Sequence, residues 1–559
     1  MTEELVRTLL ANRGVEDENE KEIFLNPDYE TGLHDPFLMK DMDKAISRFL
    51  DAISKNERIV IFTDYDTDGL PAAAMFHDFF KKIEYENFEN YIPHRHGEGF
   101  GLNKQAIDTL KKNNAALLLT ADCGITNHEE VEHARTLDID VIITDHHLPR
   151  DKAGEVSEDL PKAYAILNPH QKGDEYPFKE LCGCGVAFKF LQGVIQKGKE
   201  KEIFDIHDGW EKWLLDMVAI ATVSDMVPLV GENRVLAHFG LKVLRKSPRP
   251  GLMRLFRNLY INQRFLTEDD IGFVIGPRIN AASRMDDPVL GFNFLSERDE
   301  TAALETLKQL NRLNDKRKGV VAGIVKEARK KINRDEIKEI IVAGNPNWQP
   351  GVLGLAANTL SKEFERPVFL WGRLGSPIIR GSCRSDGSIH VVEFMQGVEG
   401  DVFSDFGGHE RAGGFTIHNE KIHTFEEALL RARELVPKYT SEQKDKPVDT
   451  TLLLDEVNER TLSAVEQLAP FGMGNPKPIF LFENIKIHDI QFFGKEKNHM
   501  TFLFKNNDDK IVSAISFFAD KKLTDFKEGE RVTLTVHMER NGFRGSREPR
   551  LRLVDIRRT

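Results

Sequence analysis

The stretch RIVIFTDYDTDG at residues 58–69 joins a short apolar run to a run of aspartates. The apolar half, residues 58–63, has the length and the β-branched and aromatic composition of a buried strand. Two similar runs follow, ALLLTA at 116–121 and DVIIT at 140–144, and amphipathic stretches such as 103–114 separate the runs. Because strands and helices alternate in this way, the sequence predicts βαβ units and a parallel sheet.

Each of the three predicted strands runs straight into side chains that can bind metal ions, namely Asp64 and Asp66, then Asp122, then Asp145, His146 and His147. In parallel sheets ligands bind beyond the carboxyl ends of the strands. Carboxylates suit Mg²⁺, and carboxylates together with imidazole suit Mn²⁺. Asp225, in AIATVSDMVPL, follows another apolar run and adds a further acidic position. We therefore expect a metal site at this edge of the sheet.

The D-x-D-x-D-G pattern at residues 64–69 also opens the calcium loop of an EF-hand. In that interpretation Asp64 is the first loop position and Met75 the twelfth, where a bidentate glutamate is required, and a strand precedes the loop instead of a helix. We reject the EF-hand for these reasons. A purely structural interpretation, in which the aspartates only cap a helix that begins near Ala72, accounts for one carboxylate but not for three.

The rest of the chain divides into three further parts. Residues 296–332 carry leucine, isoleucine and valine at helical spacing, which predicts a long helix between lobes. A new α/β segment begins with EIIVAG at 339–344, and alternating strand patterns after the linker at 441–447 predict a small barrel such as an OB-fold. We therefore predict an α/β protein with a catalytic region at 1–295, a connecting helix at 296–335, a second α/β lobe at 336–440 and an OB-type barrel at 448–559.

Composition narrows the classes of protein. The chain of 559 residues has 40% hydrophobic and 30% charged residues, as folded domains do, and no apolar run approaches the roughly 18 residues that cross a bilayer. The first residues, MTEELVRTLL, lack the basic and apolar regions of a signal peptide. The four cysteines form no CxxC pair, which fits a reducing compartment and disfavours zinc. We expect a cytoplasmic protein without a membrane anchor.

Charge is distributed unevenly along the chain. A net charge of -13 argues against nucleic-acid binding by the whole surface but allows a local basic groove. Residues 541–559 hold six arginines against Glu548 and Asp555. This segment is either a surface for an anionic polymer or an exposed, solvated strand, and both interpretations stay open.

Ten short motifs follow one another along the chain: DYDTDG (64–69), ADCG (121–124), DHH (145–147), LCGCGVAFK (181–189), SDMVPL (224–229), GPRINAASRM (276–285), GVLGLAA (351–357), GSCRS (381–385), GGHERAGG (407–414) and PFGMGNP (470–476). With them the chain resembles the DHH phosphoesterase superfamily, which takes its name from the triplet at 145–147. Within that superfamily it resembles the RecJ family of single-strand-specific exonucleases. The resemblance covers nearly the full length.

The resemblance implies ligands for two cations, Mn²⁺ or Mg²⁺: Asp66, Asp122, His146 and Asp225 for one, and Asp64 with the bridging Asp122 for the other. Asp68 and Asp145 are then carboxylates that orient ligands. His147 is a candidate to contact the scissile phosphate or to transfer a proton, and its alternative is a buried, hydrogen-bonded imidazole. Several DHH enzymes carry a histidine shortly before the first aspartate, where this chain has Val60 and Phe62. We therefore expect the second cation to be held more loosely.

Residues of the second lobe and the barrel are expected to bind the substrate. The resemblance implies a set of phosphate ligands: Arg95, Arg278, Ser382, Arg384 and His409. Arg284 could contact the connecting helix or DNA. In the barrel, Phe543 and Arg544 combine an aromatic ring with positive charge, which is typical of single-strand binding.

The main hypothesis is a metal-dependent 5′-to-3′ exonuclease that hydrolyses single-stranded DNA in DNA repair and recombination. The direction of cleavage comes from the resemblance alone. A DHH nanoRNase or cyclic-dinucleotide phosphodiesterase is a second hypothesis, which the extra barrel disfavours. A non-catalytic replication scaffold is a third, which the complete acidic set disfavours. We expect single-stranded DNA as the main partner, single-strand-binding protein or a helicase as protein partners, and a monomer.

Overall fold

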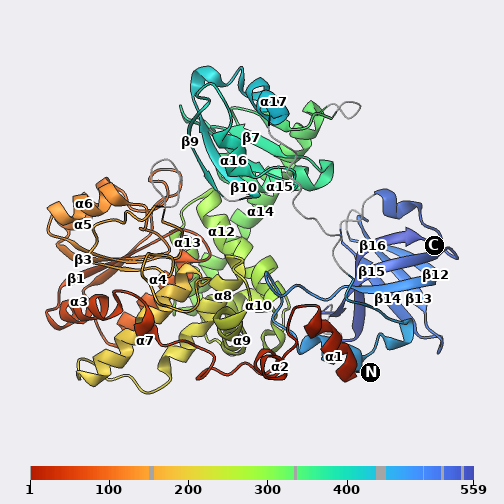
Figure 1. Cartoon of the computed structure of the whole chain (residues 1–559), viewed down its shortest axis with the longest axis horizontal. Coiled ribbons are helices and arrows are strands. Elements are labelled where there is room, and N and C mark those ends of the chain that lie inside the picture. Colours follow the sequence, from red (N-terminus) through yellow and green to blue (C-terminus); the bar gives the residue numbers. More distant parts are fainter. Residues whose placement is uncertain are drawn as a thin grey trace.

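The computed structural model describes residues 2–149, 157–332, 337–408, 410–435, 448–494, 497–517, 521–542 and 547–559. They form a large lobe, a smaller α/β lobe and a β-barrel, and helix α14 (Glu300–Lys331) runs from the large lobe to the smaller one (Figure 1). The predicted fold class is thereby confirmed. None of the described helices has the length and apolar character that crossing a membrane requires.

The large lobe is built on a five-stranded sheet in which every neighbouring pair of strands is parallel. In spatial order the strands are β2 (Phe88–Tyr91), β1 (Arg58–Thr63), β3 (Ala115–Ala121), β4 (Asp140–Thr144) and β5 (Ala165–Leu167). The three runs that the sequence predicts as strands of a parallel sheet are therefore β1, β3 and β4.

Helices cover both faces of this sheet. On one face, Ile59 and Ile61 of β1 pack in the core that includes residues of α3 (Met42–Ser54), α4 (Gly69–Lys82) and α7 (Gly183–Glu200). On the other face, Val60 and Phe62 pack with residues of α5 (Lys104–Lys112) and α6 (His128–Thr136). Because side chains alternate between two buried faces, β1 has no polar side and reads as a continuous apolar run.

A helical region completes the large lobe beside the sheet (Figure 1). It contains α8 (Leu215–Ser224), α9 (Gly231–Leu244), α10 (Pro250–Asn258), α11 (Glu268–Asp270), a π-helical turn (Ile271–Ile275), α12 (Gly276–Met285) and α13 (Val289–Ser296). Helices α10, α12 and α13 pack against α14, which attaches the connecting helix to this lobe.

The smaller lobe has a mixed five-stranded sheet in the order β6 (Ile341–Gly344), β7 (Val368–Gly372), β8 (Ile379–Arg384), β10 (Ala412–Ile417) and β9 (Phe403–Gly408). Only β6 and β7 are parallel. Helices α15 (Leu353–Phe364), α16 (Val391–Gln396) and α17 (Phe425–Leu435) accompany the sheet. Ile324, Val325 and Ala328 of α14 pack with α15, so the far end of the connecting helix belongs to this core.

The third body closes into a barrel because β12 pairs with both β13 and β15. Its strands are β11 (Thr450–Thr451), β12 (Phe480–Phe493), β13 (His499–Lys505), β14 (Ile511–Ser516), β15 (Arg531–Arg540) and β16 (Pro549–Arg558), and α18 (Glu459–Glu466) precedes β12. Helix α1 (Thr2–Ala11) also contributes Leu5, Val6, Leu9 and Leu10 to the barrel core. Both ends of the chain therefore lie at the barrel (Figure 1).

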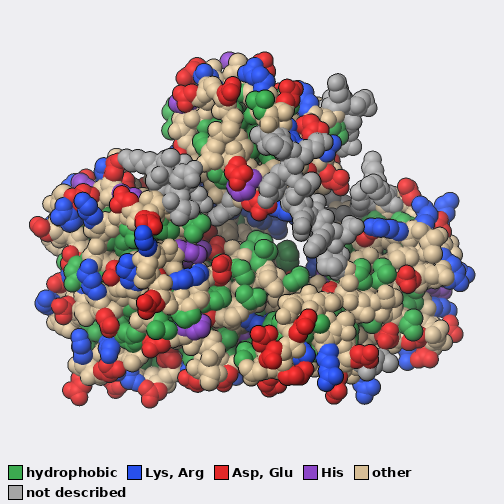
Figure 2. Space-filling model, in the orientation of Figure 1, with side chains coloured by type: hydrophobic (Ala, Val, Ile, Leu, Met, Phe, Trp, Pro, Cys, Tyr) green, Lys and Arg blue, Asp and Glu red, His purple; other side chains and the backbone are tan. Residues whose placement is uncertain are grey.

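Ion pairs join arginines of β16 to acidic neighbours on the barrel: Arg550 to Glu539, Arg557 to Asp555 and Arg558 to Glu530. The guanidinium of Arg547 lies 3.5 Å from the ring centroid of Phe265 in the large lobe. The ion pairs favour the exposed-strand interpretation for β16, whereas Arg547 packs on the large lobe. Acidic and basic side chains are interspersed over the face in Figure 2, which is hollowed where the three bodies meet.

Arg234 of α9 fastens the barrel side to the large lobe. Its guanidinium donates to the carbonyl oxygens of Leu468 (3.0 Å) and Ala469 (3.1 Å), and to that of Phe24 (2.9 Å) at the end of α2 (Glu18–Leu25). The residue is only 3% exposed, and burial lowers its pKa to about 10. A buried cation that is satisfied by carbonyl groups links three segments that are distant in the sequence.

We predict that Arg234→Met destabilises the protein by about 3 kcal/mol, because the carbonyl oxygens of Phe24 and Ala469 lose their donor and the link between the segments is lost, whereas Leu468 O keeps the Asn475 side chain as a donor. Urea denaturation followed by circular dichroism measures the change. Arg135→Met is the matched control, since Arg135 pairs with Glu132 on the surface of a single helix. Equal unfolding midpoints for the two variants would contradict the role given to Arg234.

Candidate functional site

The ends of β1, β3 and β4 bring acidic residues to one edge of the parallel sheet. The amide of Asp64 donates to Ala121 O (3.3 Å), that of Asp122 to Thr144 O (3.0 Å) and that of Asp145 to Leu167 O (3.0 Å). Each aspartate thus extends the hydrogen bonding of the sheet by one residue. The sheet itself therefore sets the spacing of the three carboxylates.

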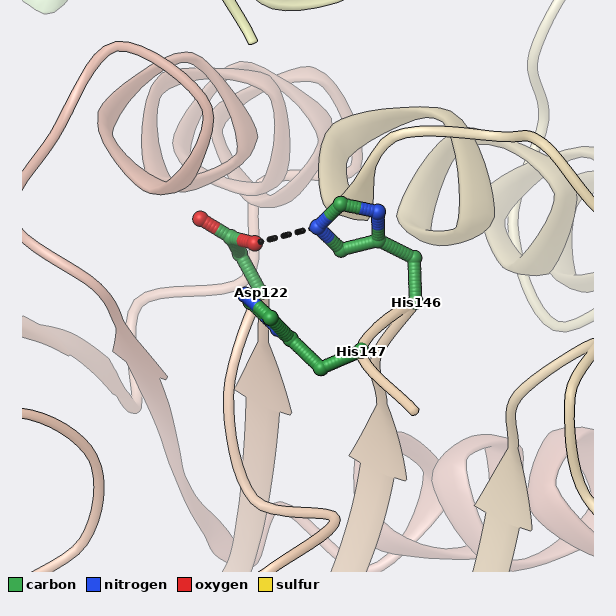
Figure 3. A group of neighbouring side chains, drawn as sticks. All are labelled: Asp122, His146 and His147. Carbon is green, nitrogen blue, oxygen red and sulfur yellow. Dashed lines mark ion pairs between the residues drawn. The ribbon is translucent and has the colours of Figure 1, made fainter. Parts of the chain in front are cut away.

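Side chains that could ligate a metal ion gather at this edge in three overlapping groups: Asp64, Asp66 and Asp122; Asp68, His146 and Asp225; and Asp122, His146 and His147. Within each group one ligand atom of every residue lies within 4.8 Å of the others. His146 Nε2 lies 3.3 Å from Asp122 Oδ1 and 3.8 Å from Asp225 Oδ2. Figure 3 shows Asp122 and His146 pointing toward one another from the ends of neighbouring strands. Asp122 belongs to two of the groups.

The carboxylates of these groups repel one another. The pKa of Asp122 is well above its usual value because the residue is buried, and because Asp68, Asp66, Asp64 and Asp225 lie near it. Burial, followed by the charge of Asp66, likewise raises the pKa of Asp64. Asp64 Oδ1 is buried and has no hydrogen-bond partner. Burial with the charges of Asp68 and Asp66 raises the pKa of Asp225 to about 8. A site so rich in carboxylate oxygens, whose ionisation is opposed in the absence of cations, fits hard divalent cations.

The two histidines differ in protonation. Burial lowers the pKa of His146, so its imidazole is neutral and can offer a lone pair to a cation. Burial also acts to lower the pKa of His147, but the Asp145 carboxylate outweighs it and raises that pKa to about 9. His147 Nδ1 lies 2.8 Å from Asp145 Oδ1, which also accepts the amides of His146 and His147. Asp145 therefore fixes the His147 imidazole directly and the backbone of His146 and His147 through their amides.

The backbone at the start of α7 contacts Asp68 and Asp122 of the cluster. The amides of Gly183 and Cys184 donate to the two carboxylate oxygens of Asp68, at 2.7 and 2.8 Å. A Cβ atom on Gly183 would come 2.6 Å from Asp122 Cβ, so only glycine fits there. These contacts give the LCGCG motif a physical role. Asp68 Oδ2 also lies 3.7 Å from His146 Nε2. Asp68, which the sequence analysis expects only to orient ligands, is therefore itself close enough to be a candidate ligand.

Asp225 follows α8 and opens a short loop that a barrel-side segment holds in place. The amide of Leu229 donates to Met473 O (2.7 Å), and a Cβ atom on Gly472 would come 2.8 Å from Leu229 Cδ1. The PFGMGNP motif thus packs on the Asp225 loop, and its glycines allow this close approach. Val60 and Phe62, where some DHH enzymes carry a histidine, are fully buried in an apolar core and supply no ligand.

Two arginines of the large lobe, Arg95 and Arg284, lie near the acidic cluster, and Arg317 and Arg384 lie near Arg284. The guanidinium of Arg95 lies 4.9 Å from the ring centroid of Tyr65, which stands between two of the cluster aspartates. Arg284 donates to Gly351 O (3.0 Å) of the smaller lobe, and burial together with Arg95, Arg317 and Arg384 lowers its pKa to about 10. Among the described residues, no carboxylate forms an ion pair with Arg95, Arg284, Arg317 or Arg384. Their charge is therefore available to an anion.

The remaining predicted phosphate ligands have different surroundings. Ser382 and Arg384 lie on β8, and Arg384 packs on α15, where a Cβ atom on Gly354 would come 2.8 Å from Nη2. Arg278 donates to Asn311 Oδ1 (2.9 Å) and Val274 O (2.8 Å), so packing against α14 occupies part of its guanidinium. His409, Phe543 and Arg544 lie outside the described residues.

The sequence patterns do not predict that Arg284 lies near the acidic cluster. They also do not identify Arg317 as a partly buried arginine. Arg317 comes from α14 and its Nε is buried without a partner. In the sequence it is one of many charged residues of a long helix. Only the packing of α14 and α12 between the lobes distinguishes it from a solvated arginine.

Three family models match the chain. They are the N-terminal domain of the DHH family at residues 58–222, the DHHA1 domain at 337–439 and the RecJ OB domain at 448–555. The single-stranded-DNA-specific exonuclease RecJ of Bacillus subtilis is 31% identical over 99% of this chain and 67% of its own length. RecJ of Haemophilus influenzae is 30% identical over 93% of this chain and 91% of its own length.

Solved structures are similar as well. Thermus thermophilus RecJ in complex with Mn²⁺ matches 99% of this chain and 76% of its own, with a TM-score of 0.78 and 24% identity, and supports the fold. An exonuclease RecJ bound to manganese matches 74% of this chain and 98% of its own, with a TM-score of 0.61 and 27% identity.

We predict that Mn²⁺ raises the thermal stability of the metal-free protein, because the cation binds only the folded cluster. Asp122→Asn should lose most of this gain, and without metal it should be no less stable than the wild type, because it removes one of several crowded charges. Differential scanning fluorimetry over a Mn²⁺ titration measures both effects. The control is Asp108→Asn, which changes a surface carboxylate paired with His133. An unchanged Mn²⁺ response of Asp122→Asn would contradict this assignment.

Proposed function

This chain belongs to the RecJ family of single-stranded-DNA-specific exonucleases, and we propose that it degrades single-stranded DNA from the 5′ end by hydrolysing phosphodiester bonds. The main observation behind the proposal is that a cluster of carboxylates and a group of arginines lie close together. A buried acidic cluster that fits divalent cations lies near arginines that form no ion pair with a carboxylate of the described chain. A phosphodiester bound to cations requires both kinds of charge.

Mn²⁺ or Mg²⁺ would be held by Asp64, Asp66, Asp122, His146 and Asp225, with Asp122 shared between two ions. Bound there, the cations would stabilise negative charge on the attacking and leaving oxygens and make water a stronger nucleophile near neutral pH. Asp68 and Asp145 would orient the ligands, because each is already fixed by backbone amides.

His147 would serve the substrate as a proton donor. Against the effect of burial, the Asp145 carboxylate raises the pKa of His147 to about 9 and engages its Nδ1. The remaining ring nitrogen, Nε2, is then the one that carries a proton toward a phosphate or a leaving oxygen. Asp122 would contribute to the reaction by holding the cations.

The arginines would place the strand. Arg384 and Ser382 of the smaller lobe would hold the terminal 5′ phosphate, since a guanidinium can grip a phosphate through two hydrogen bonds. Arg95, Arg278 and Arg284 would contact further phosphates at the boundary between the lobes. His409 is proposed for the same surface by its place in the GGHERAGG motif.

The barrel would hold the strand that trails away from the site. Phe492 and Phe517 are 48% and 43% exposed on it, so aromatic faces are available to bases. Phe543 and Arg544 are proposed to join them. We further propose that the protein acts as a monomer in DNA repair and recombination, together with single-strand-binding protein or a helicase.

We predict that Asp122→Ala lowers the cleavage of a 5′-labelled single-stranded oligonucleotide in Mn²⁺ by at least about a thousandfold, about 4 kcal/mol of barrier. The reason is that both cations lose the shared ligand. A duplex of the same sequence tests whether the wild type requires single-stranded DNA, and we expect the duplex to be cleaved more slowly. Activity within about tenfold of the wild type, about 1.4 kcal/mol, would show that Asp122 is not the shared ligand.

Arg384→Ala is predicted to abolish a preference for 5′-phosphorylated strands. We expect wild-type kcat/KM to be about tenfold higher on a 5′-phosphate than on a 5′-hydroxyl oligonucleotide, and the ratio to fall to about one in the variant. Arg431→Ala, which removes an exposed arginine of α17 in the same lobe, is the control. If Arg384→Ala slows both substrates by one factor, the 5′ phosphate binds elsewhere.

A further inference from the structure

Phe100 is an exposed aromatic residue beside the metal centre. Half of its surface, 50%, is exposed, and it belongs to none of the hydrophobic cores formed by the described residues. Its ring centroid lies 5.7 Å from that of His147, at an interplanar angle of 76°. His147 in turn groups with Asp122 and His146. An apolar ring that the core does not use therefore lies one side chain away from the proposed ligands.

The loop that carries Phe100 is anchored on both sides of the ring. Before it, the Glu98 carboxylate accepts from Tyr91 Oη (2.5 Å) and from the His94 amide (2.7 Å). After it, the Leu102 amide donates to Asn127 Oδ1 (3.2 Å). The two anchors belong to the end of β2 and to the loop that follows β3, so they share the framework of the acidic cluster.

The glycines that flank Phe100 show that this loop shape is specific. Gly99 and Gly101 have φ angles of +89° and +75°, which residues with a side chain rarely adopt. A Cβ atom on Gly101 would also come 2.6 Å from Asn127 Oδ1. The backbone is therefore shaped to present Phe100 in an exposed position, at the cost of leaving an apolar ring in water.

We propose that Phe100 is a stacking platform for the base of a nucleotide that flanks the scissile phosphate. The inference rests on the proposed function, because it assigns a binding partner within that same site. An aromatic face binds any base, so the platform would hold the strand without selecting a sequence. Phe100 would then be a substrate-binding residue of the site, alongside the arginines that contact the phosphates.

The alternative is that Phe100 only positions His147. Asp145 already fixes that imidazole through Nδ1, and the backbone of the triplet through two amides. The edge-on contact with Phe100 adds no hydrogen bond. A positioning role also leaves the exposed half of the ring unexplained, whereas a stacked base would cover it.

The test compares Phe100→Leu, Phe100→Tyr and the wild type on two oligonucleotides in Mn²⁺. One is an ordinary single strand, and the other carries abasic tetrahydrofuran units at the two nucleotides that flank the first scissile bond. On the ordinary strand, Phe100→Leu should lower kcat/KM by about tenfold, mainly through KM, and Phe100→Tyr should stay close to the wild type. On the abasic strand, all three proteins should be equal.

A loss in Phe100→Leu that is equally large on both strands would overturn the platform, because it would place the effect on His147 or the loop. Wild-type kinetics for Phe100→Leu on both strands would overturn it as well. Binding of Mn²⁺, followed by fluorimetry, should be unchanged in both variants, and a weakened affinity would also argue for positioning. A wild type that cleaves neither strand would overturn the proposed function itself.

Discussion

The repulsion among buried carboxylates at the end of the parallel sheet is the constraint on which the rest of the structure depends. Asp64, Asp122 and Asp225 all have raised pKa values there, because burial and neighbouring charges oppose their ionisation. The fold holds them together through sheet hydrogen bonds and the start of α7. The PFGMGNP segment braces the Asp225 loop from the barrel side. Such crowding costs stability unless cations neutralise it.

A second arrangement of charge complements the first. Arg95 and Arg284 come from the large lobe, Arg384 comes from the smaller lobe, and burial with mutual repulsion lowers the pKa of Arg284. The large lobe carries the acidic cluster, and the arginines lie at the boundary between the two lobes. Neither lobe by itself therefore contains both kinds of charge. In the proposed function, a phosphodiester chain with divalent cations would satisfy both at once and would require both lobes.

The sequence predicts those features that depend on local order. Strand ends followed by Asp64, Asp122 and Asp145 predict a shared sheet edge, because parallel strands end together. It does not predict the contact between Gly472 and Leu229, or the packing of α1 in the barrel core, since both join segments hundreds of residues apart. For another reason, the exposed position of Phe100 is not predicted. A single phenylalanine in a sequence is most often a buried core residue.

We propose that one carboxylate cluster binds two cations through a shared ligand, Asp122. Electron paramagnetic resonance of the protein titrated with Mn²⁺ tests it directly. At saturation we expect two Mn²⁺ ions per chain and the broadened, exchange-coupled spectrum of a pair, and Asp122→Asn should remove the coupling. A six-line spectrum of magnetically isolated Mn²⁺ that persists to saturation would contradict the account.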